Sequence, residues 1–241
     1  MNELKLNNVC IAADGKQIVN GIDLSVKKGE VHILMGPNGS GKSSLVFAIM
    51  GHPGYKVTDG SIEVDSKNIT ALPANERSKL GIFMAFQHPV SVPGINTMTF
   101  LRKLYNQKHK DAPVSEFKKE VDKFVGESLI KKELLQRSIN DDFSGGEKKR
   151  AEVLQFAIMK PEIAIFDEID SGLDVDAVRS IAKIIQENAK NSAILLITHH
   201  ESLIKYVKPD KVHVMVDGRI VKSGGSELVK QIEEHGYGVF A

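Results

Sequence analysis

Residues 36–43 read Gly-Pro-Asn-Gly-Ser-Gly-Lys-Ser, and this run matches in full the pattern of a loop that binds the phosphates of a nucleotide. An apolar segment, residues 31–35, precedes the loop, and a helical pattern follows over residues 42–50. The glycines permit backbone conformations that turn successive N–H groups toward one anion, and the start of the helix adds its positive end. The loop therefore requires a strand, a turn and a helix in this order, which constrains the fold more than any other feature of the chain.

The residues of this loop have distinct expected roles toward ATP and Mg²⁺. Lys42 is expected to reach the β- and γ-phosphates, and the Ser43 hydroxyl is expected to ligate Mg²⁺. A glycine-rich turn with a surface lysine is the simpler alternative, but the flanking strand and helix patterns argue against it. The predicted ATP contacts in this part of the chain are Gly36, Pro37, Asn38, Gly39, Ser40, Gly41, Lys42, Ser43 and Ser44.

Strand and helix patterns alternate along much of the chain, which is typical of the α/β class with a parallel sheet covered by helices on both faces. The N-terminal segment alternates apolar and polar side chains and breaks at Asp14-Gly15, so it predicts an antiparallel hairpin. Charged helical patterns fill the middle of the chain. We expect a single domain in which residues 1–94 and 160–241 form the nucleotide-binding core with a β-subdomain, and residues 95–159 form an inserted helical subdomain.

A second chemical motif stands where an apolar strand pattern, residues 163–166, runs into Asp167 and Glu168. Ligands of open α/β sheets bind beyond the carboxyl ends of the strands, so both carboxylates are expected at the nucleotide. Asp167 is expected to orient Mg²⁺, and Glu168 is expected to be the general base that polarises the attacking water. Two solvated acids that cap the next helix are the alternative, and the phosphate loop in the same chain disfavours it.

The composition argues against several classes of protein. The formal net charge of +1 does not suit a nucleic-acid binder. Cys10 is the single cysteine, so the chain offers neither an internal disulfide nor the thiolates of an iron–sulfur cluster. No apolar run approaches the ~20 residues of a membrane helix, and the first residues lack the apolar centre of a signal peptide. We expect a cytoplasmic protein without direct membrane insertion and without a nucleic-acid partner.

Four further segments resemble motifs of the ABC ATPases, in the order found in that family. Gln87 resembles the Q-loop glutamine, residues 143–147 the signature sequence, residues 171–174 the D-loop, and His199 the switch histidine. This resemblance implies a P-loop NTPase fold of the ABC cassette type, with a RecA-like core, an N-terminal antiparallel β-subdomain and an inserted helical subdomain.

The same resemblance implies roles for these residues. Gln87 would contact Mg²⁺ and the reaction centre, and His199 would donate a hydrogen bond near the γ-phosphate. Ser144, Gly145 and Gly146 would bind the γ-phosphate held by a second copy of the chain, which implies a dimer that forms on ATP. The alternatives are a satisfied polar core residue for His199 and an ordinary helix N-cap for Ser144.

The chain is most similar to the ATPases of the Suf iron–sulfur cluster assembly system, the SufC family. The signature contains Phe143 and Glu147 where most transport cassettes have leucine and glutamine. That family implies partners of the SufB and SufD scaffold type. The nucleotide-binding subunit of a membrane ABC transporter is the alternative. A non-hydrolysing switch module is a third reading, disfavoured because such modules normally carry two cassettes. The segments that carry the likeness are 81–87, 143–150, 167–174, 218–224 and 234–238.

Two regions outside these motifs carry further expectations. ABC cassettes commonly stack an N-terminal aromatic ring on adenine, but no aromatic residue precedes Phe47, and the hairpin tip, residues 12–15, reads Ala-Ala-Asp-Gly. Because base stacking contributes about 1–3 kcal/mol, we expect weak base recognition beside an intact phosphate grip. Residues 148–150, Lys-Lys-Arg, read most simply as a solvated helix face.

The segment 88–95, directly after Gln87, mixes two prolines with apolar residues. Each proline removes a backbone donor, so a paired central strand is disfavoured. Val90, Val92 and Ile95 either pack inward as local core or form a docking surface for a scaffold helix. The family resemblance favours docking, because ABC cassettes meet their partners beside this loop.

Overall fold

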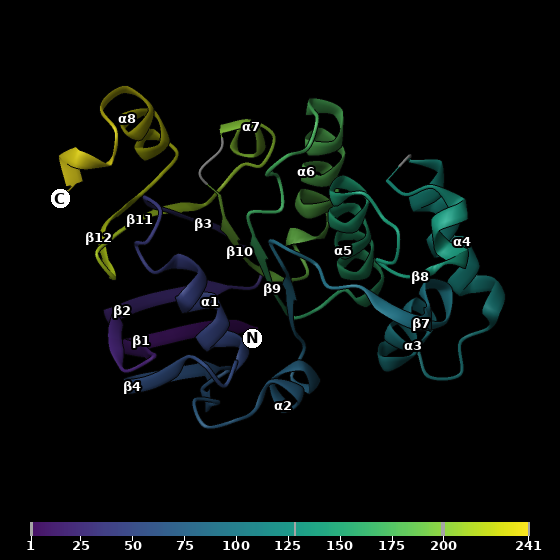
Figure 1. Cartoon of the computed structure of the whole chain (residues 1–241), viewed down its shortest axis with the longest axis horizontal. Coiled ribbons are helices and arrows are strands. Elements are labelled where there is room, and N and C mark those ends of the chain that lie inside the picture. Colours follow the sequence, from purple (N-terminus) through teal and green to yellow (C-terminus); the bar gives the residue numbers. More distant parts are fainter. Residues whose placement is uncertain (1, 128, 199–200, 241) are drawn as a thin grey trace.

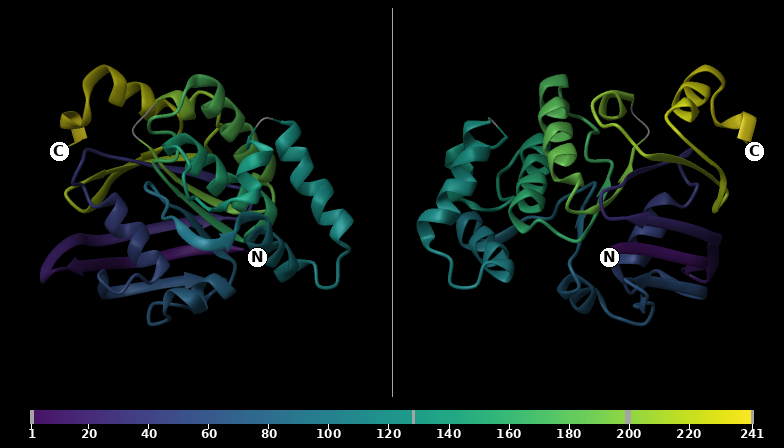
Figure 2. Two further views of the ribbon diagram at one scale, coloured as in Figure 1. Left: turned by 45° about the vertical axis from the view of Figure 1, so that its right-hand side comes forward. Right: turned by 180° about the vertical axis from the view of Figure 1, so that it is seen from behind.

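The computed structural model describes residues 2–127, 129–198 and 201–240. Figure 1 shows an open sheet at the centre of the molecule, with a second, N-terminal sheet on one side and helices on the other. The views in Figure 2 place the helices α3 (Thr97–Lys108) and α4 (Val114–Gly126) at the opposite end of the molecule from the C-terminal segment. The molecule is therefore layered, with the central sheet shared between two packing faces.

The central sheet has six strands in the order β12-β11-β3-β10-β9-β6. Neighbouring strands are parallel, except that β12 pairs antiparallel with β11. This arrangement confirms the predicted α/β class. The strands are β3 (Val31–Met35), β6 (Ile82–Ala85), β9 (Ile163–Asp167), β10 (Ala193–Ile197), β11 (Lys211–Val216) and β12 (Arg219–Gly224).

The N-terminal sheet is antiparallel, with the order β2-β1-β4-β5. Its first hairpin turns at Asp14 and Gly15, as predicted, and both residues have positive φ, 49° and 74°. Positive φ at both turn positions suits the tight hairpin turns that match the twist of the strands. The strands are β1 (Glu3–Ala13), β2 (Lys16–Lys27), β4 (Lys56–Val64) and β5 (Lys67–Asn68).

Helix α1 (Lys42–Met50) packs between the two sheets, where Leu45, Val46 and Ile49 join one buried cluster with both of them. Successive side chains of a strand point to opposite faces, so each central strand contributes to two clusters. In β9, Ile163 and Ile165 belong to the α1 cluster, whereas Ala164 and Phe166 belong to the cluster on the other face. The phosphate loop, which ends in α1, is thereby anchored in the core of the molecule.

Helices cover the other face of the central sheet, where α5 and α6 lie beside the strands (Figure 1). The segment expected as an inserted helical subdomain holds α3, α4 and α5, and its exact borders stay a prediction. Among the described residues, none of the helices combines the length and apolar character needed to cross a bilayer. The other helical elements are α2 (Ala74–Lys79), η1 (Lys132–Gln136), α5 (Gly145–Met159), α6 (Val175–Ala189), α7 (Glu201–Ile204), α8 (Glu227–His235) and η2 (Tyr237–Phe240).

The proline-containing segment forms part of a small separate ribbon. Its strand β7 (Val92–Asn96) pairs with β8 (Ser138–Ile139) outside the central sheet, in agreement with the prediction that it is no paired central strand. Inward packing of its apolar residues, the first alternative above, is wrong. Val90 is 74% exposed, Ile95 is 45% exposed and Val92 is 38% exposed.

Candidate active site

Four neighbouring strands of the central sheet end beside the predicted site. β3, β10, β9 and β6 run parallel and lie next to one another in this order. The phosphate loop follows β3, Asp167 ends β9, and Gln87 comes two residues after β6. Because parallel strands end at one edge of a sheet, the topology brings these segments together. His199 follows β10 but lies outside the described residues, so its role stays a prediction.

The phosphate loop contains glycines that its surroundings require. A Cβ atom on Gly36 would lie 2.1 Å from the carbonyl oxygen of Met215 in β11, so no larger residue fits there. Gly41 caps the start of α1 with φ of 101°, a left-handed conformation that glycine adopts without steric cost. Ser40 is buried beside them. The predicted loop conformation is thus specified by close packing against β11 and by the start of α1.

Lys42 is buried in this loop, with only 5% of its surface exposed. Its Nζ donates hydrogen bonds of 2.8 Å and 2.9 Å to the carbonyl oxygens of Gly36 and Pro37. Burial lowers the pKa of Lys42, and the carboxylates of Glu168 and Asp167 oppose this shift. The alternative of a surface lysine on a glycine-rich turn is therefore wrong.

Asp167 and Ser43 form an oxygen-rich pair that fits Mg²⁺. The Ser43 hydroxyl hydrogen-bonds to the Asp167 carboxylate, and among the described residues Oδ1 of Asp167 is buried without a hydrogen-bond partner. Burial raises the pKa of Asp167 to about 6, and the bond from Ser43 opposes the shift. Mg²⁺ prefers oxygen ligands and keeps several of its waters, so one carboxylate and one hydroxyl are a suitable protein contribution.

Glu168 and Gln87 contact each other directly. Nε2 of Gln87 donates a hydrogen bond of 2.6 Å to Oε2 of Glu168, so two residues that the sequence assigned to catalysis meet from the ends of β6 and β9. The Glu168 backbone has φ of 48°, and its N–H donates to the carbonyl oxygen of Ile197 in β10 at 2.9 Å. Gln87 thus contacts the carboxylate of Glu168, and β10 holds its backbone.

Lys149 corrects the interpretation of residues 148–150 as a solvated face, because only 7% of its surface is exposed. Its Nζ donates to the carbonyl oxygens of Glu168 at 2.8 Å and of Ser171 at 2.6 Å. Burial lowers the pKa of Lys149, and the carboxylate of Asp170 is the largest opposing influence. This cation fastens the segment after β9 to helix α5.

A sequence signal for the burial of Lys149 did exist. Val153, Phe156 and Ala157 stand four, seven and eight residues after Lys149, which is the spacing of one helix face. The sequence interpretation used only the stripe formed by residues 151, 154 and 158, and those three residues are indeed buried. Helix α5 is covered on more than one side, so a single amphipathic stripe underestimates its contacts.

Ser144 starts helix α5 through a capping box with Glu147. Its Oγ accepts from the Glu147 N–H at 3.3 Å, while Oε2 of Glu147 accepts from the Ser144 N–H at 3.0 Å. This bond from the Ser144 backbone, together with Lys131, lowers the pKa of Glu147 to about 2. Ser144 and Gly145 are exposed. The N-cap alternative is correct as local structure, and an exposed helix start leaves room for the predicted contact with a second chain.

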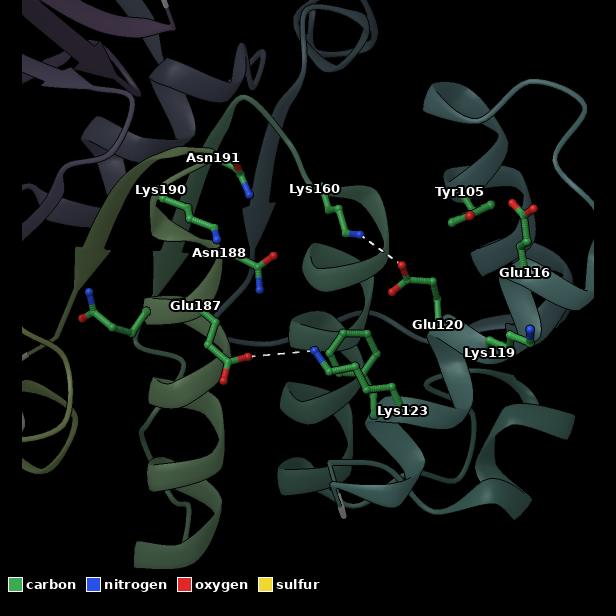
Figure 3. Close-up of a pocket in the computed structure, with 12 residues that line it drawn as sticks. Tyr105, Glu116, Lys119, Glu120, Lys123, Lys160, Glu187, Asn188, Lys190 and Asn191 are labelled. Atoms are coloured by element: carbon green, nitrogen blue, oxygen red, sulfur yellow. Dashed lines mark hydrogen bonds and ion pairs between the residues drawn. The ribbon is translucent and has the colours of Figure 1, made fainter.

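A cavity of about 970 Å³ lies elsewhere, between α4 and the end of α6 (Figure 3). Ion pairs cross it from Lys160 to Glu120 at 3.3 Å and from Lys123 to Glu187 at 4.0 Å. None of the predicted site residues lines it. Its lining mixes lysines with glutamates that pair across it, so the cavity is a contact region between α4 and the core and not a candidate for the nucleotide.

Comparison with known proteins adds to this geometry. The model of the ABC transporter family matches residues 19–171. A probable ATP-dependent transporter of Synechocystis is 46% identical over 245 aligned positions, which cover 97% of this chain and 94% of that protein.

Two solved structures share the fold. An ATP-binding subunit of an ABC transporter has a TM-score of 0.79 at 20% identity, covering 96% of this chain and 93% of that one. A dimeric ATP-binding cassette in a post-hydrolysis state, bound to ADP and Pi, has a TM-score of 0.75 at 21% identity, covering 92% of this chain and 98% of that one. The predicted cassette fold is therefore confirmed.

Proposed function

Because this chain belongs to the family of ABC transporter ATPases, we propose that it is the separate ATPase subunit of a Suf-type iron–sulfur cluster assembly complex in the cytoplasm. The chain binds ATP with Mg²⁺ and hydrolyses it to ADP and phosphate. The proposal adds the partner, a scaffold of the SufB and SufD type. It also assigns the residues that perform each step.

The contact between Glu168 and Gln87 supports the proposed hydrolytic step. A water oxygen attacks the γ-phosphorus, the bond to the β-phosphate oxygen breaks, and the proton of the water passes to the Glu168 carboxylate. Lys42 stabilises negative charge on the phosphates. Gln87 orients the carboxylate through the 2.6 Å hydrogen bond. Ser43 and Asp167 would hold Mg²⁺, which would supply positive charge to offset the negative charge of the phosphates.

A second copy of the chain completes each site in this proposal. Ser144, Gly145 and Gly146 begin α5, and a helix start offers N–H groups to an anion. Ser144 and Gly145 are exposed, so they are accessible to a γ-phosphate held by the phosphate loop of another subunit. Two identical surfaces would meet about a two-fold axis, which gives two shared sites in one ATP-bound dimer.

The observation that carries the scaffold proposal is the exposed apolar surface after β6. Phe86, Val90, Val92 and Ile95 are exposed by 39%, 74%, 38% and 45%, and they fall within ten consecutive residues. Clustered apolar residues on a surface mark sites of protein–protein contact. Gln87 lies inside this stretch and touches Glu168. A partner that binds here would therefore act on a segment that reaches the general base.

This apolar segment is held to the helical part of the chain by polar contacts. Nδ2 of Asn140 donates to the Val90 carbonyl oxygen at 3.0 Å, and Oγ of Ser91 donates to the Asn140 carbonyl oxygen at 2.6 Å. In α5, the buried carboxyl of Glu152 accepts a hydrogen bond from the Phe86 backbone, and burial raises the pKa of Glu152 to about 7. The segment thus presents its apolar side chains from a fixed backbone.

The scaffold proposal is tested by isolating the tagged chain from its native cells and identifying the subunits bound to it. We expect a soluble scaffold, and we expect Val92→Glu to reduce its recovery at least tenfold, because a charge would be buried against apolar surface. The matched control is Val114→Glu, the same change at an exposed valine in α4. Basal ATPase of the isolated variants should be unchanged.

Recovery of a membrane permease in place of a soluble scaffold would favour the transporter alternative. Equal scaffold recovery with wild type, Val92→Glu and Val90→Glu would place the docking surface elsewhere. Neither result would contradict the assignment of ATPase activity to this chain.

A further inference from the structure

A cavity of about 560 Å³ lies against the phosphate loop, outside the contacts discussed so far. Gly39 and Ser44 of the loop region line one side, and Ala13 and Asp14 of the β1–β2 hairpin line another. The volume falls within the range of small-molecule pockets, about 300–1,000 Å³. In a nucleotide, only the ribose separates the phosphates from the base. When the phosphates contact this loop, the base can therefore reach this cavity.

Among the described residues that line this cavity, Tyr55 is the aromatic one, and it comes from outside the hairpin. Tyr55 directly precedes β4, which pairs antiparallel with β1 in a register that sets Lys56 opposite Ala12. The residue before Lys56 therefore lies beside the residue after Ala12, at the end of the hairpin. The sequence expectation of weak base recognition rested on the missing hairpin aromatic, and pairing between β1 and β4 brings a ring to that place.

The Tyr55 ring is held in position by its neighbours. Phe47 of α1 stacks against it with a centroid distance of 5.3 Å and an interplanar angle of 13°, and His52 meets it edge-on at 5.4 Å. Phe47 is one turn beyond Lys42 and Ser43 in the helix that begins at the phosphate loop. The ring is consequently fixed relative to the phosphates, and a preorganised ring loses little entropy when a base stacks on it.

We propose that Tyr55 is the residue on which the base of the bound nucleotide stacks. Stacking accepts every base with a large π-face, so it selects purines over pyrimidines and does not separate ATP from GTP. The polar side chains that line the cavity offer no second means of selecting the base. Nε2 of Gln17 already donates to the Val19 carbonyl oxygen at 2.7 Å, and Nδ2 of Asn20 donates to the Asp217 carbonyl oxygen at 3.2 Å.

The charged rim leads to the same conclusion about selectivity. Asp14 offers an acceptor that suits the amino group of adenine, and Lys16 offers a donor that suits the carbonyl oxygen of guanine. Both residues are exposed, where such bonds compete with water and contribute little. This inference depends on nucleotide binding alone and does not rest on the scaffold proposal.

The first test compares affinities by calorimetry. Tyr55→Ala should weaken ATP binding about 5- to 150-fold, the equivalent of about 1–3 kcal/mol per stacked base, whereas Tyr55→Phe should retain the wild-type affinity. Magnesium triphosphate, which lacks a base, should bind wild type and Tyr55→Ala equally. Tyr206→Ala, at an exposed tyrosine after α7, is the control. Unchanged ATP affinity in Tyr55→Ala, or an equal loss for triphosphate, would overturn the proposal.

The second test exploits the absence of tryptophan from the chain. Tyr55→Trp introduces one indole, which presents a larger stacking face. Its fluorescence is not overlaid by that of any other tryptophan in the chain. ATP and GTP should change its fluorescence at similar concentrations, CTP should require a higher concentration, and triphosphate should leave the emission unchanged. An emission that responds equally to ATP and triphosphate would show that the ring senses loop closure and does not contact the base.

Discussion

Glu168 contacts Gln87 and Lys149, which come from different parts of the chain. Gln87 donates to its carboxylate and Lys149 donates to its backbone carbonyl, so α5 and the end of β6 both control one residue. The Glu168 carboxylate accepts a hydrogen bond of 2.6 Å from the Gln87 amide. In the proposed function, this contact links the exposed apolar segment to the proposed general base through Gln87.

The Glu168→Gln variant should bind ATP with wild-type affinity and turn over about 10²–10⁴-fold more slowly, because the amide has the same shape but accepts no proton. Steady-state phosphate release gives the rate, and calorimetry gives the affinity. Glu116→Gln, at an exposed position of α4, is the matched control. Hydrolysis at the wild-type rate in Glu168→Gln would remove this residue from the mechanism.

The candidate site residues could be named from the sequence because most of them stand in short motifs. Asp167 and Glu168 follow a recognisable strand, and the phosphate loop is contiguous. The burial of Lys149 had a local signal in the helix-face spacing of its neighbours, but its contacts with the segment after β9 depend on packing between distant segments. Tyr55 escaped prediction for a related reason, since its place beside the loop depends on the register of β4 against β1. Contacts of this kind are set by tertiary pairing and leave little local signal.

Among the secondary-structure elements, β3 and β11 carry a buried histidine pair. Nδ1 of His32 and Nε2 of His213 lie 3.1 Å apart, and Nδ1 of His213 lies 2.7 Å from the Ser223 hydroxyl of β12. Burial, with His32 and Lys211 as further influences, lowers the pKa of His213 to about 4. His32 also has a lowered pKa because of burial, although Glu30 opposes the shift. Both rings are thus neutral between these strands at neutral pH.

His213 should contribute a loss of stability in mild acid. Its pKa in the folded chain is below the ordinary 6.5, so the unfolded chain takes up a proton first and the folded state loses stability as the pH drops through 6.5 toward 4. The contribution of His213 from pH 7 to pH 5 is a loss of about 2 kcal/mol. Urea unfolding at both pH values should show that the change in stability differs by this amount between wild type and His213→Gln, in the direction that favours the variant at pH 5.

The comparison with His213→Gln is necessary because other groups act in the opposite direction. Glu152 and Asp167 have raised pKa values, about 7 and about 6, so their protonation stabilises the folded chain as the pH falls. The difference between wild type and the variant isolates the histidine. An identical pH dependence in both proteins would show that His213 does not control acid stability.

The strands and helices themselves followed closely from sequence periodicity. The predicted strands at 31–35 and 163–166 appear as β3 and β9, with one residue more in β9. The ribbon of β7 and β8 was not predicted, because β8 has only two residues and its pairing joins segments about forty residues apart. Short strands of this length carry no readable alternation, so only the tertiary structure reveals them.

At the scale of the whole molecule, shared active sites make a quantitative prediction. Lys42→Ala and Ser144→Arg proteins should each be inactive, because each dimer lacks one half of both sites. In an equal mixture about half of the dimers are hybrids, and each hybrid has one intact site, so about a quarter of wild-type ATPase should return. Phosphate release by the mixture is the measurement. No recovery, although hybrid dimers form in light scattering, would contradict sharing between subunits.

The backbone of Glu168 has a consequence for how such a chain evolves. At φ of 48° a glycine or asparagine would be less strained than a glutamate, and strain of this kind costs about 1–3 kcal/mol. Selection for stability alone would replace the glutamate. In the proposed function, a glutamate at this position trades stability for reactivity. Descendants of this chain that lose hydrolysis should therefore drift at position 168 before they drift in the surrounding core.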